Sequence, residues 1–171
     1  MRTSRMVKAT DAKMSELNNK IKKNFWLIKF APFRTAWPEI VRRGLFIPRG
    51  IRSPEARNNL KTMKKGDSVL FYQSQRNQAV VGLLEVVRTA YSDPTGTDPQ
   101  WLTCDFHPVR TLSRPVSLAE IKDDSSLADI PLIRQPRLAV MPLTKATFQR
   151  IVCSATDNSA ILAIIKQKDA V

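Results

Sequence analysis

Short apolar runs separated by polar turns dominate much of the chain and predict β-strands. Residues 25–30, FWLIKF, are bulky and aromatic, as expected of a buried first strand. Two further runs, SVLFYQS at 68–74 and AVVGLLEVVRTAY at 79–91, are rich in β-branched and aromatic residues, and the polar turn QRNQ separates them. We therefore expect these two runs to form an antiparallel hairpin.

Two later segments also have the pattern of strands. Residues 101–109, WLTCDFHPV, alternate apolar and polar positions like a half-buried strand. Pro108 places this strand at a sheet edge, because proline has no N–H to donate to a neighbour. Residues 137–143, RLAVMPL, predict a final strand, and the proline- and glycine-containing segment SDPTGTDPQ predicts a loop.

Helical spacing in the first half of the chain predicts two helices. The segment TAWPEIVRRGL at 35–45 has one apolar stripe and ends at Gly44; the stripe is formed by Trp37, Ile40 and Val41. In the second helix we expect Ser53 to cap a first turn that holds a proline and a glutamate. Its buried face is Ala56, Leu60 and Met63, and its remaining surface is unusually basic.

Three helices are expected in the second half. SLAEIKDD at 117–124 begins with a serine and has Glu120 three residues later, which predicts a capping box. TKATFQRIV at 144–152 is a second capped helix, and NSAILAIIKQK at 158–168 a C-terminal one.

Strands and helices do not alternate regularly, and several strands follow one another directly. This order favours an α+β fold, a mixed β-barrel flanked by short helices, over a doubly wound parallel sheet. The sequence has no internal repeats, which excludes solenoids and propellers. Its 171 residues suit one domain with a real core.

Positive charge is concentrated at the start of the sequence. The formal net charge is +13, from 28 Lys and Arg and 15 Asp and Glu. Residues 1–24 hold seven basic and two acidic residues, residues 25–65 hold ten and two, and the remainder holds eleven of each. A local excess of this kind favours a polyanionic partner such as nucleic acid. The alternative is a solubilising tail followed by a solvated helix face.

Several protein classes are disfavoured. No apolar run is long enough to cross a membrane, and the N-terminus lacks a signal-peptide core. We therefore expect no membrane partner and an intracellular, non-secreted protein, cytoplasmic in a bacterium and nuclear or mitochondrial in a eukaryote. Cys104 and Cys153 lie far apart and predict free thiols.

No catalytic signature is present in the sequence. His107 is the only histidine, and a histidine before a proline in a strand is more often structural than catalytic. The sequence has no phosphate loop, no dinucleotide fingerprint and no metal-ligand cluster. We therefore expect no enzymatic activity, no cofactor and no metal.

Six blocks in the sequence together resemble a known family. They are FWLIK, GIRSPEARNNLKTMKKGDSVLFYQS, VVGLLEVVRTAYSDPT, DPQW, PVSLAEIK and RLAVMPLT, in that order. This pattern closely resembles the EVE domain, a PUA-like domain related to the YTH and ASCH domains, and it runs from about Phe25 to Ile151. We accordingly divide the chain into a basic tail at 1–24, an EVE domain at 25–153 and a helical extension at 154–171.

The resemblance implies a PUA-like β-barrel with a pocket for a nucleobase. The expected function is that of a non-catalytic reader of a modified base in DNA or RNA, which takes the base out of its stack. The alternative is a structural RNA-binding component of a ribonucleoprotein, such as a ribosome, with a degraded base pocket.

The match is uneven at the pocket positions. The family's Lys-Ser-Glu-Pro becomes Lys-Phe-Ala-Pro at 29–32, which keeps only the lysine and the proline. Its Trp-Asp-Gly-Val-Arg-Asn becomes Pro-Arg-Gly-Ile-Arg-Ser at 48–53, so the cage tryptophan is lost. Its Phe-Tyr-His-Ser becomes Phe-Tyr-Gln-Ser at 71–74, and Ala139 and Met141 stand where the family often has polar residues.

The resemblance and the charge pattern together give two sets of expected binding residues. The base pocket is expected to comprise Lys29, Phe30, Gly50, Ile51, Arg52, Ser53, Arg57, Asn58, Tyr72, Gln73 and Ser74. The phosphate contacts are expected to be Arg34, Arg49, Lys61, Lys64 and Lys65. Phe30 is the candidate to supply part of the stacking that the missing tryptophan would give.

Overall fold

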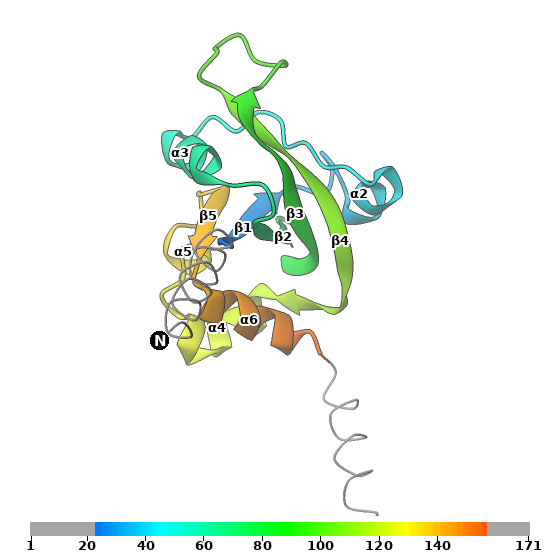
Figure 1. Ribbon diagram of the computed structural model, residues 1–171. Helices are drawn as coiled ribbons and strands as arrows, with labels where there is room; N and C mark the ends of the chain where they lie inside the picture. The colour runs from blue at the N-terminus through cyan, green and yellow to red at the C-terminus, as the bar shows by residue number, and fades with distance from the viewer. Residues whose placement is uncertain (1–22, 157–171) are drawn as a thin grey trace, which may run out of the picture.

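A single mixed sheet organises residues 23–156, which the computed structural model describes (Figure 1). The strands lie in the order β4-β3-β2-β1-β5, and are β1 (Phe25–Phe30), β2 (Ser68–Gln73), β3 (Ala79–Ser92), β4 (Leu102–Ser117) and β5 (Val140–Leu143). Nearly all of the expected basic tail and the expected helix at 158–168 lie outside the described residues.

The first strand lies inside the sheet and joins segments that are distant in sequence. β1 pairs in parallel with β2 and antiparallel with β5. Its residues Trp26, Leu27 and Ile28 are at most 5% exposed, which confirms the predicted buried strand. The parallel register places Lys29 directly opposite Tyr72.

Antiparallel pairing builds the other side of the sheet. β2 and β3 form the predicted hairpin, and β3 continues antiparallel to β4. β4 is an edge strand, as Pro108 predicted, and it runs on to Ser117 through several irregularities of register.

The predicted α+β class is confirmed, but within residues 23–156 the sheet stays open where a closed barrel was expected. Among the described residues, the outer edge of β4 makes only a single bridge, between Phe106 and Phe46. At the other edge, β5 is four residues long and contains Pro142, which cannot donate a backbone hydrogen bond.

Short helices pack around the sheet. They are α2 (Trp37–Arg43), α3 (Pro54–Thr62), α4 (Leu118–Asp123), the 3₁₀ helix η1 (Ser125–Leu127), α5 (Pro131–Arg134) and α6 (Lys145–Ser154). The capping box of α4 and the Thr144 cap of α6 are confirmed.

Ser53 precedes α3 as predicted, but its side chain makes no capping hydrogen bond. Val41 was predicted to lie on the buried stripe of α2, yet it is 46% exposed, because the short helix turns mainly Trp37 and Ile40 towards the sheet.

Aromatic side chains fill the core between α2 and the sheet. Phe46 makes edge-on contacts with Phe30 and Phe71, at centroid distances of 5.1 and 5.3 Å. Trp37 lies 5.4 Å from Phe71, and its indole N–H donates to the Thr111 hydroxyl over 2.9 Å.

A buried carboxylate ties the start of β1 to the turn before β2. Asp67 is only 2% exposed. Its Oδ1 accepts from the backbone N–H of Asn24, and its Oδ2 accepts from the Trp26 indole and the backbone N–H of Lys64, at 2.9–3.0 Å. The three hydrogen bonds that the Asp67 carboxylate accepts offset the unfavourable free energy of burying it.

Candidate nucleic-acid interface

A surface cavity opens at the N-terminus of α3. It has a volume of about 420 Å³, and it is lined by Ser53 and Glu55 on one side and by Gln135, Pro136, Arg137 and Leu138 on the other. The first group begins α3, and the second connects α5 to β5. The fold therefore builds this cavity from two segments about eighty residues apart.

Lys29 and Tyr72 lie on the paired ends of β1 and β2; Lys29 contacts a residue that lines the cavity, whereas Tyr72 is only 2% exposed. The Lys29 ammonium donates to the carbonyl of Pro136, a cavity-lining residue, and lies 5.9 Å from the centroid of the Tyr72 ring. Burial lowers the pKa of Lys29 and raises the pKa of Tyr72 to about 12. Tyr72 is therefore a neutral phenol at physiological pH, able both to donate and to accept a hydrogen bond.

Two arginines next to the cavity contact the loop that joins β3 to β4. The Arg52 guanidinium lies 4.1 Å from the centroid of the Trp101 ring, a stacked cation–π arrangement. Arg57 donates from Nη1 to the Gln100 carbonyl over 3.0 Å. Its Nε is buried and has no hydrogen-bond partner within residues 23–156.

A network around Asp93 fixes the turn that leads to Arg52. Gly50 has φ +73°, and its N–H donates to Asp93 over 2.9 Å. Arg49 pairs with the same carboxylate at 3.2 Å, while Arg34 donates to the Arg49 carbonyl and stacks on Phe30. Two of the expected phosphate-binding arginines thus make internal contacts that hold this turn.

Acid should remove the stabilisation that Asp93 provides. Burial alone would raise the pKa of this carboxyl, but donors from Gly50, Thr95 and Arg49 together lower it from 3.8 to about 2. Because the folded-state pKa is the lower one, the stabilisation is complete above about pH 5 and is lost as the pH falls towards 2. It amounts to about 2 kcal/mol at neutral pH.

We expect Asp93→Asn to lower the free energy of unfolding at pH 7 and to flatten its decline between pH 5 and 2. Urea titrations across this range measure both effects. A variant whose stability falls with acid as steeply as the wild type would contradict this assignment.

The other expected site residues fall into three groups by burial. Phe30 and Ile51 are 7% and 6% exposed and belong to the core, and neither is among the residues that line the cavity. Gln73 and Ser74 are half-buried where β2 ends, and the Ser74 N–H donates to the Phe30 carbonyl. The rest are exposed, namely Asn58, Lys61, Lys64 and Lys65.

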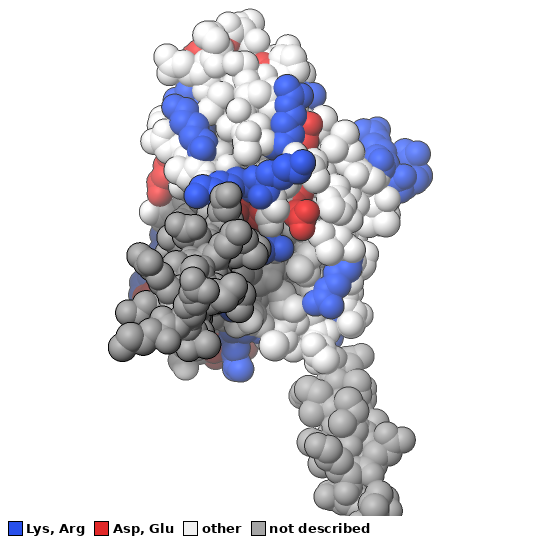
Figure 2. Space-filling view, in the orientation of Figure 1, with Lys and Arg blue, Asp and Glu red and all other residues white. Residues whose placement is uncertain are grey.

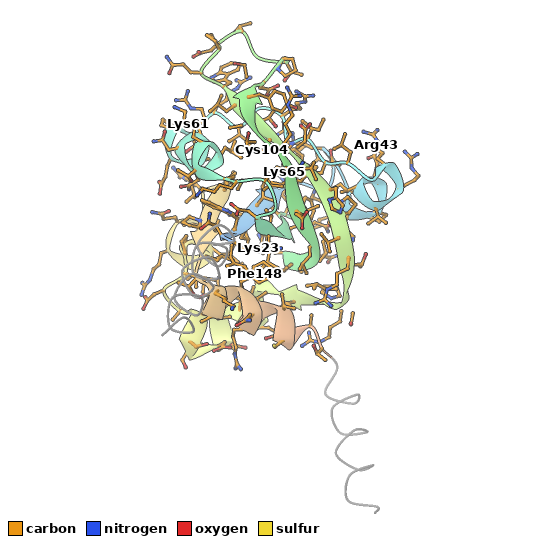
Figure 3. All side chains as sticks on the ribbon, in the orientation of Figure 1. Lys23, Arg43, Lys61, Lys65, Cys104 and Phe148 are labelled. Atoms are coloured by element: carbon orange, nitrogen blue, oxygen red, sulfur yellow. The ribbon has the colours of Figure 1, made fainter. Side chains whose placement is uncertain are left out.

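Basic side chains gather on the face seen in Figure 2, where they form a band across the region of α3 with a further cluster over α2. Figure 3 labels Lys61, Lys65 and Lys23 on this face, and Arg43 on α2. The cationic surface on this face therefore includes α2 as well as the region of α3.

Several functional candidates were not predicted from the sequence. Glu55 was predicted only to lie in the first turn of a helix, and Gln135 and Pro136 were given no role. Arg137 and Leu138 were predicted to begin the last strand, which starts instead at Val140. Gln100 and Trp101 belong to the DPQW block of the resemblance, but no binding role was predicted for them. Met141, expected near the pocket, is fully buried in the core, whereas the Ala139 carbonyl accepts from the Lys29 N–H over 2.8 Å.

Within residues 23–156 there is no cluster of three or more potential metal-ligating side chains. No helix among these residues is long and apolar enough to cross a membrane. Both cysteines are free; Cys104 is buried and Cys153 is exposed.

The fold agrees with a family-level match. The model of the EVE domain family matches residues 24–154. The chain therefore belongs to the EVE domain family.

Curated relatives include thymocyte nuclear protein 1 from two vertebrates. The Gallus gallus protein is 31% identical over 126 residues, which cover 60% of this chain and 52% of the relative. The Homo sapiens protein is 29% identical over 126 residues, which cover 60% of this chain and 56% of the relative. The chain thus spans about half the length of these relatives.

Solved structures share the fold. Protein Atu2648 from Agrobacterium tumefaciens is 32% identical, with a TM-score of 0.75 over 77% of this chain and 92% of the other. The DUF55 domain of human thymocyte nuclear protein 1 is 27% identical, with a TM-score of 0.69 over 77% and 98%. Human THYN1 in complex with 5-methylcytosine-containing DNA is 24% identical, with a TM-score of 0.71 over 79% and 99%.

Proposed function

We propose that this chain is a non-catalytic, nucleic-acid-binding EVE domain that receives a modified nucleobase in the cavity at the start of α3. The observation that carries the proposal is the cavity itself, about 420 Å³ in volume, with Lys29 bonded to the lining residue Pro136, Tyr72 5.9 Å from the Lys29 ammonium, and Arg52 adjacent in sequence to the lining residue Ser53. Such a volume lies in the range of small-molecule sites and accommodates a single extruded base.

The chemistry around the cavity suits a base edge and a phosphate backbone. The Tyr72 hydroxyl and the Lys29 ammonium supply polar groups, and the lining carbonyls and the Glu55 carboxylate add acceptors. Arg52 and the exposed Lys61, Lys64 and Lys65 attract the phosphates, which is a sequence-independent contribution to affinity.

Base recognition in this chain does not depend on the tryptophan that the family usually places before Gly50. Pro48 occupies that position and is buried, with its carbonyl accepting from the Thr103 hydroxyl over 2.6 Å. We therefore infer that the base is selected mainly by polar contacts and by the shape of the cavity.

Human THYN1, a protein of the same fold, was crystallised with 5-methylcytosine-containing DNA, and such DNA is the first probe. We expect the full chain to bind a 5-methylcytosine duplex more tightly than the same duplex unmodified. Arg52→Ala should weaken binding about tenfold, by removing a charged contact. Tyr72→Phe should reduce the preference for the modified base, since it removes only the hydroxyl.

Fluorescence anisotropy at several salt concentrations measures these affinities. An RNA of the same base sequence tests whether the chain prefers RNA to DNA. Arg110→Ala is the matched control, because Arg110 is exposed on β4 away from the cavity-lining residues. The reader proposal would be contradicted by binding that does not depend on base identity, is unaffected by Arg52→Ala and is lost when residues 1–22 are deleted. Such binding would favour a structural RNA-binding role instead, which the exposed Lys61, Lys64 and Lys65 would support.

A further inference from the structure

The loop between β3 and β4, residues 93–101, is attached to the segment 49–57 at three points. Asp93 holds the Gly50 N–H and Arg49, Trp101 stacks on Arg52, and the Gln100 carbonyl accepts from Arg57. Figure 1 shows this loop projecting beyond the sheet at the top of the view, above α3 and the chain that leads into it. Each attachment fixes a residue close to the mouth of the cavity.

Trp101 is itself held rigidly inside the loop. A Cβ at Gly96 would lie 2.4 Å from Cε3 of the indole, so only glycine allows this packing. The Trp101 carbonyl accepts from the Asp93 N–H over 2.7 Å, and its own N–H donates to the Asp98 carbonyl. The indole therefore lies between its own loop and the Arg52 guanidinium.

This arrangement leaves the hydrogen-bonding groups of Arg52 available. A guanidinium stacked on an aromatic ring is bound through its face, while its N–H donors lie in its plane and point outward. Arg52 is exposed and makes no salt bridge with a described carboxylate, and the same holds for the partly buried Arg57. Asp93, an acid of the same loop, is engaged with Arg49.

We propose that Arg52 and Arg57 form a phosphate-binding pair at the cavity mouth, and that Trp101 is the positioning residue that holds Arg52 for this contact. The ligand group is the phosphodiester next to the extruded nucleotide, because Ser53, the neighbour of Arg52, lines the cavity. Arg57 lies one helical turn further on, its N–H donating to the Ser53 carbonyl over 3.0 Å. The inference rests on the proposed function.

A double-mutant cycle in the full chain tests this role. We expect Trp101→Ala to weaken binding of the 5-methylcytosine duplex two- to fivefold, the range of an exposed cation–π contact. Trp101→Phe should bind within about twofold of wild type, because the ring face is kept. In the Arg52→Ala background, Trp101→Ala should have no further effect, and the salt dependence of binding should be that of Arg52→Ala alone.

Thermal unfolding checks that each variant is folded. If Trp101→Ala does not fold, Trp101→Leu replaces it, since leucine fills much of the volume without offering a ring face. Additive losses for Trp101 and Arg52, or wild-type affinity of the Trp101 variants while Arg52→Ala is weakened, would overturn the positioning role and leave the proposed function intact. A wild-type chain that binds no oligonucleotide would overturn both.

Discussion

Asp67→Ala is expected to lower the free energy of unfolding by about 3–5 kcal/mol, the range found when one partner of a buried charged network is removed. The substitution leaves the N–H groups of Asn24, Trp26 and Lys64 without their acceptor in a site that is 2% exposed to solvent. Within residues 23–156 these three donors bond to no other carboxylate.

Urea unfolding followed by tryptophan fluorescence and by circular dichroism measures this loss. Asp123→Ala is the matched control, because Asp123 is an exposed aspartate at the end of α4, and it should change stability by less than about 0.5 kcal/mol. An Asp67→Ala protein as stable as this control would show that the three donors find other acceptors at little cost.

Gly82→Ala should be nearly as damaging, by about 3 kcal/mol, through overpacking. A Cβ at this position of β3 would lie 2.0 Å from Cζ2 of Trp37 and 2.3 Å from its Cη2. The indole cannot easily withdraw, since it packs against Phe71 and its N–H is bonded to Thr111.

A second substitution separates overpacking from other effects of adding a methyl group to a strand. Trp37→Leu in the Gly82→Ala background should recover part of the stability that Gly82→Ala loses, because the smaller side chain makes room for the new Cβ. Urea unfolding of the two single variants and the double variant gives the coupling energy. A coupling near zero would mean that the Trp37 ring does not limit the size of residue 82.

The elements that the sequence predicted best are those specified by local signals. The hairpin of β2 and β3 follows from two β-rich runs around a polar turn, and the capping box of α4 follows from Ser117 and Glu120. Pro108 marked β4 as an edge strand, because one missing N–H is enough to exclude a central position.

The sequence predicted some residues near the site, but not how the fold brings the two walls of the cavity together. The family resemblance pointed to Lys29, Arg52 and Tyr72, and the parallel register of β1 and β2 then placed Lys29 opposite Tyr72. The opposite wall of the cavity, residues 135–138, carries no local signal, because only the tertiary fold brings it to α3.

Charge was the least reliable predictor of which individual residues are free to bind a nucleic acid. Arg34 and Arg49 belong to the basic region that favoured a nucleic-acid partner, yet both are used to hold the Gly50 turn. A sequence shows how many cations a segment has, but not which of them the folded chain pairs internally.

The position of β1 determines when this domain can finish folding during its synthesis. β1 is the first of the described strands to leave the ribosome, but its two neighbours are β2, which begins at Ser68, and β5, which ends at Leu143. At translation rates of about 5–20 residues per second, one edge of β1 remains unpaired for several seconds after β2 has docked. An unpaired, strongly apolar strand is a site for aggregation, so this interval is when the nascent chain most needs a chaperone.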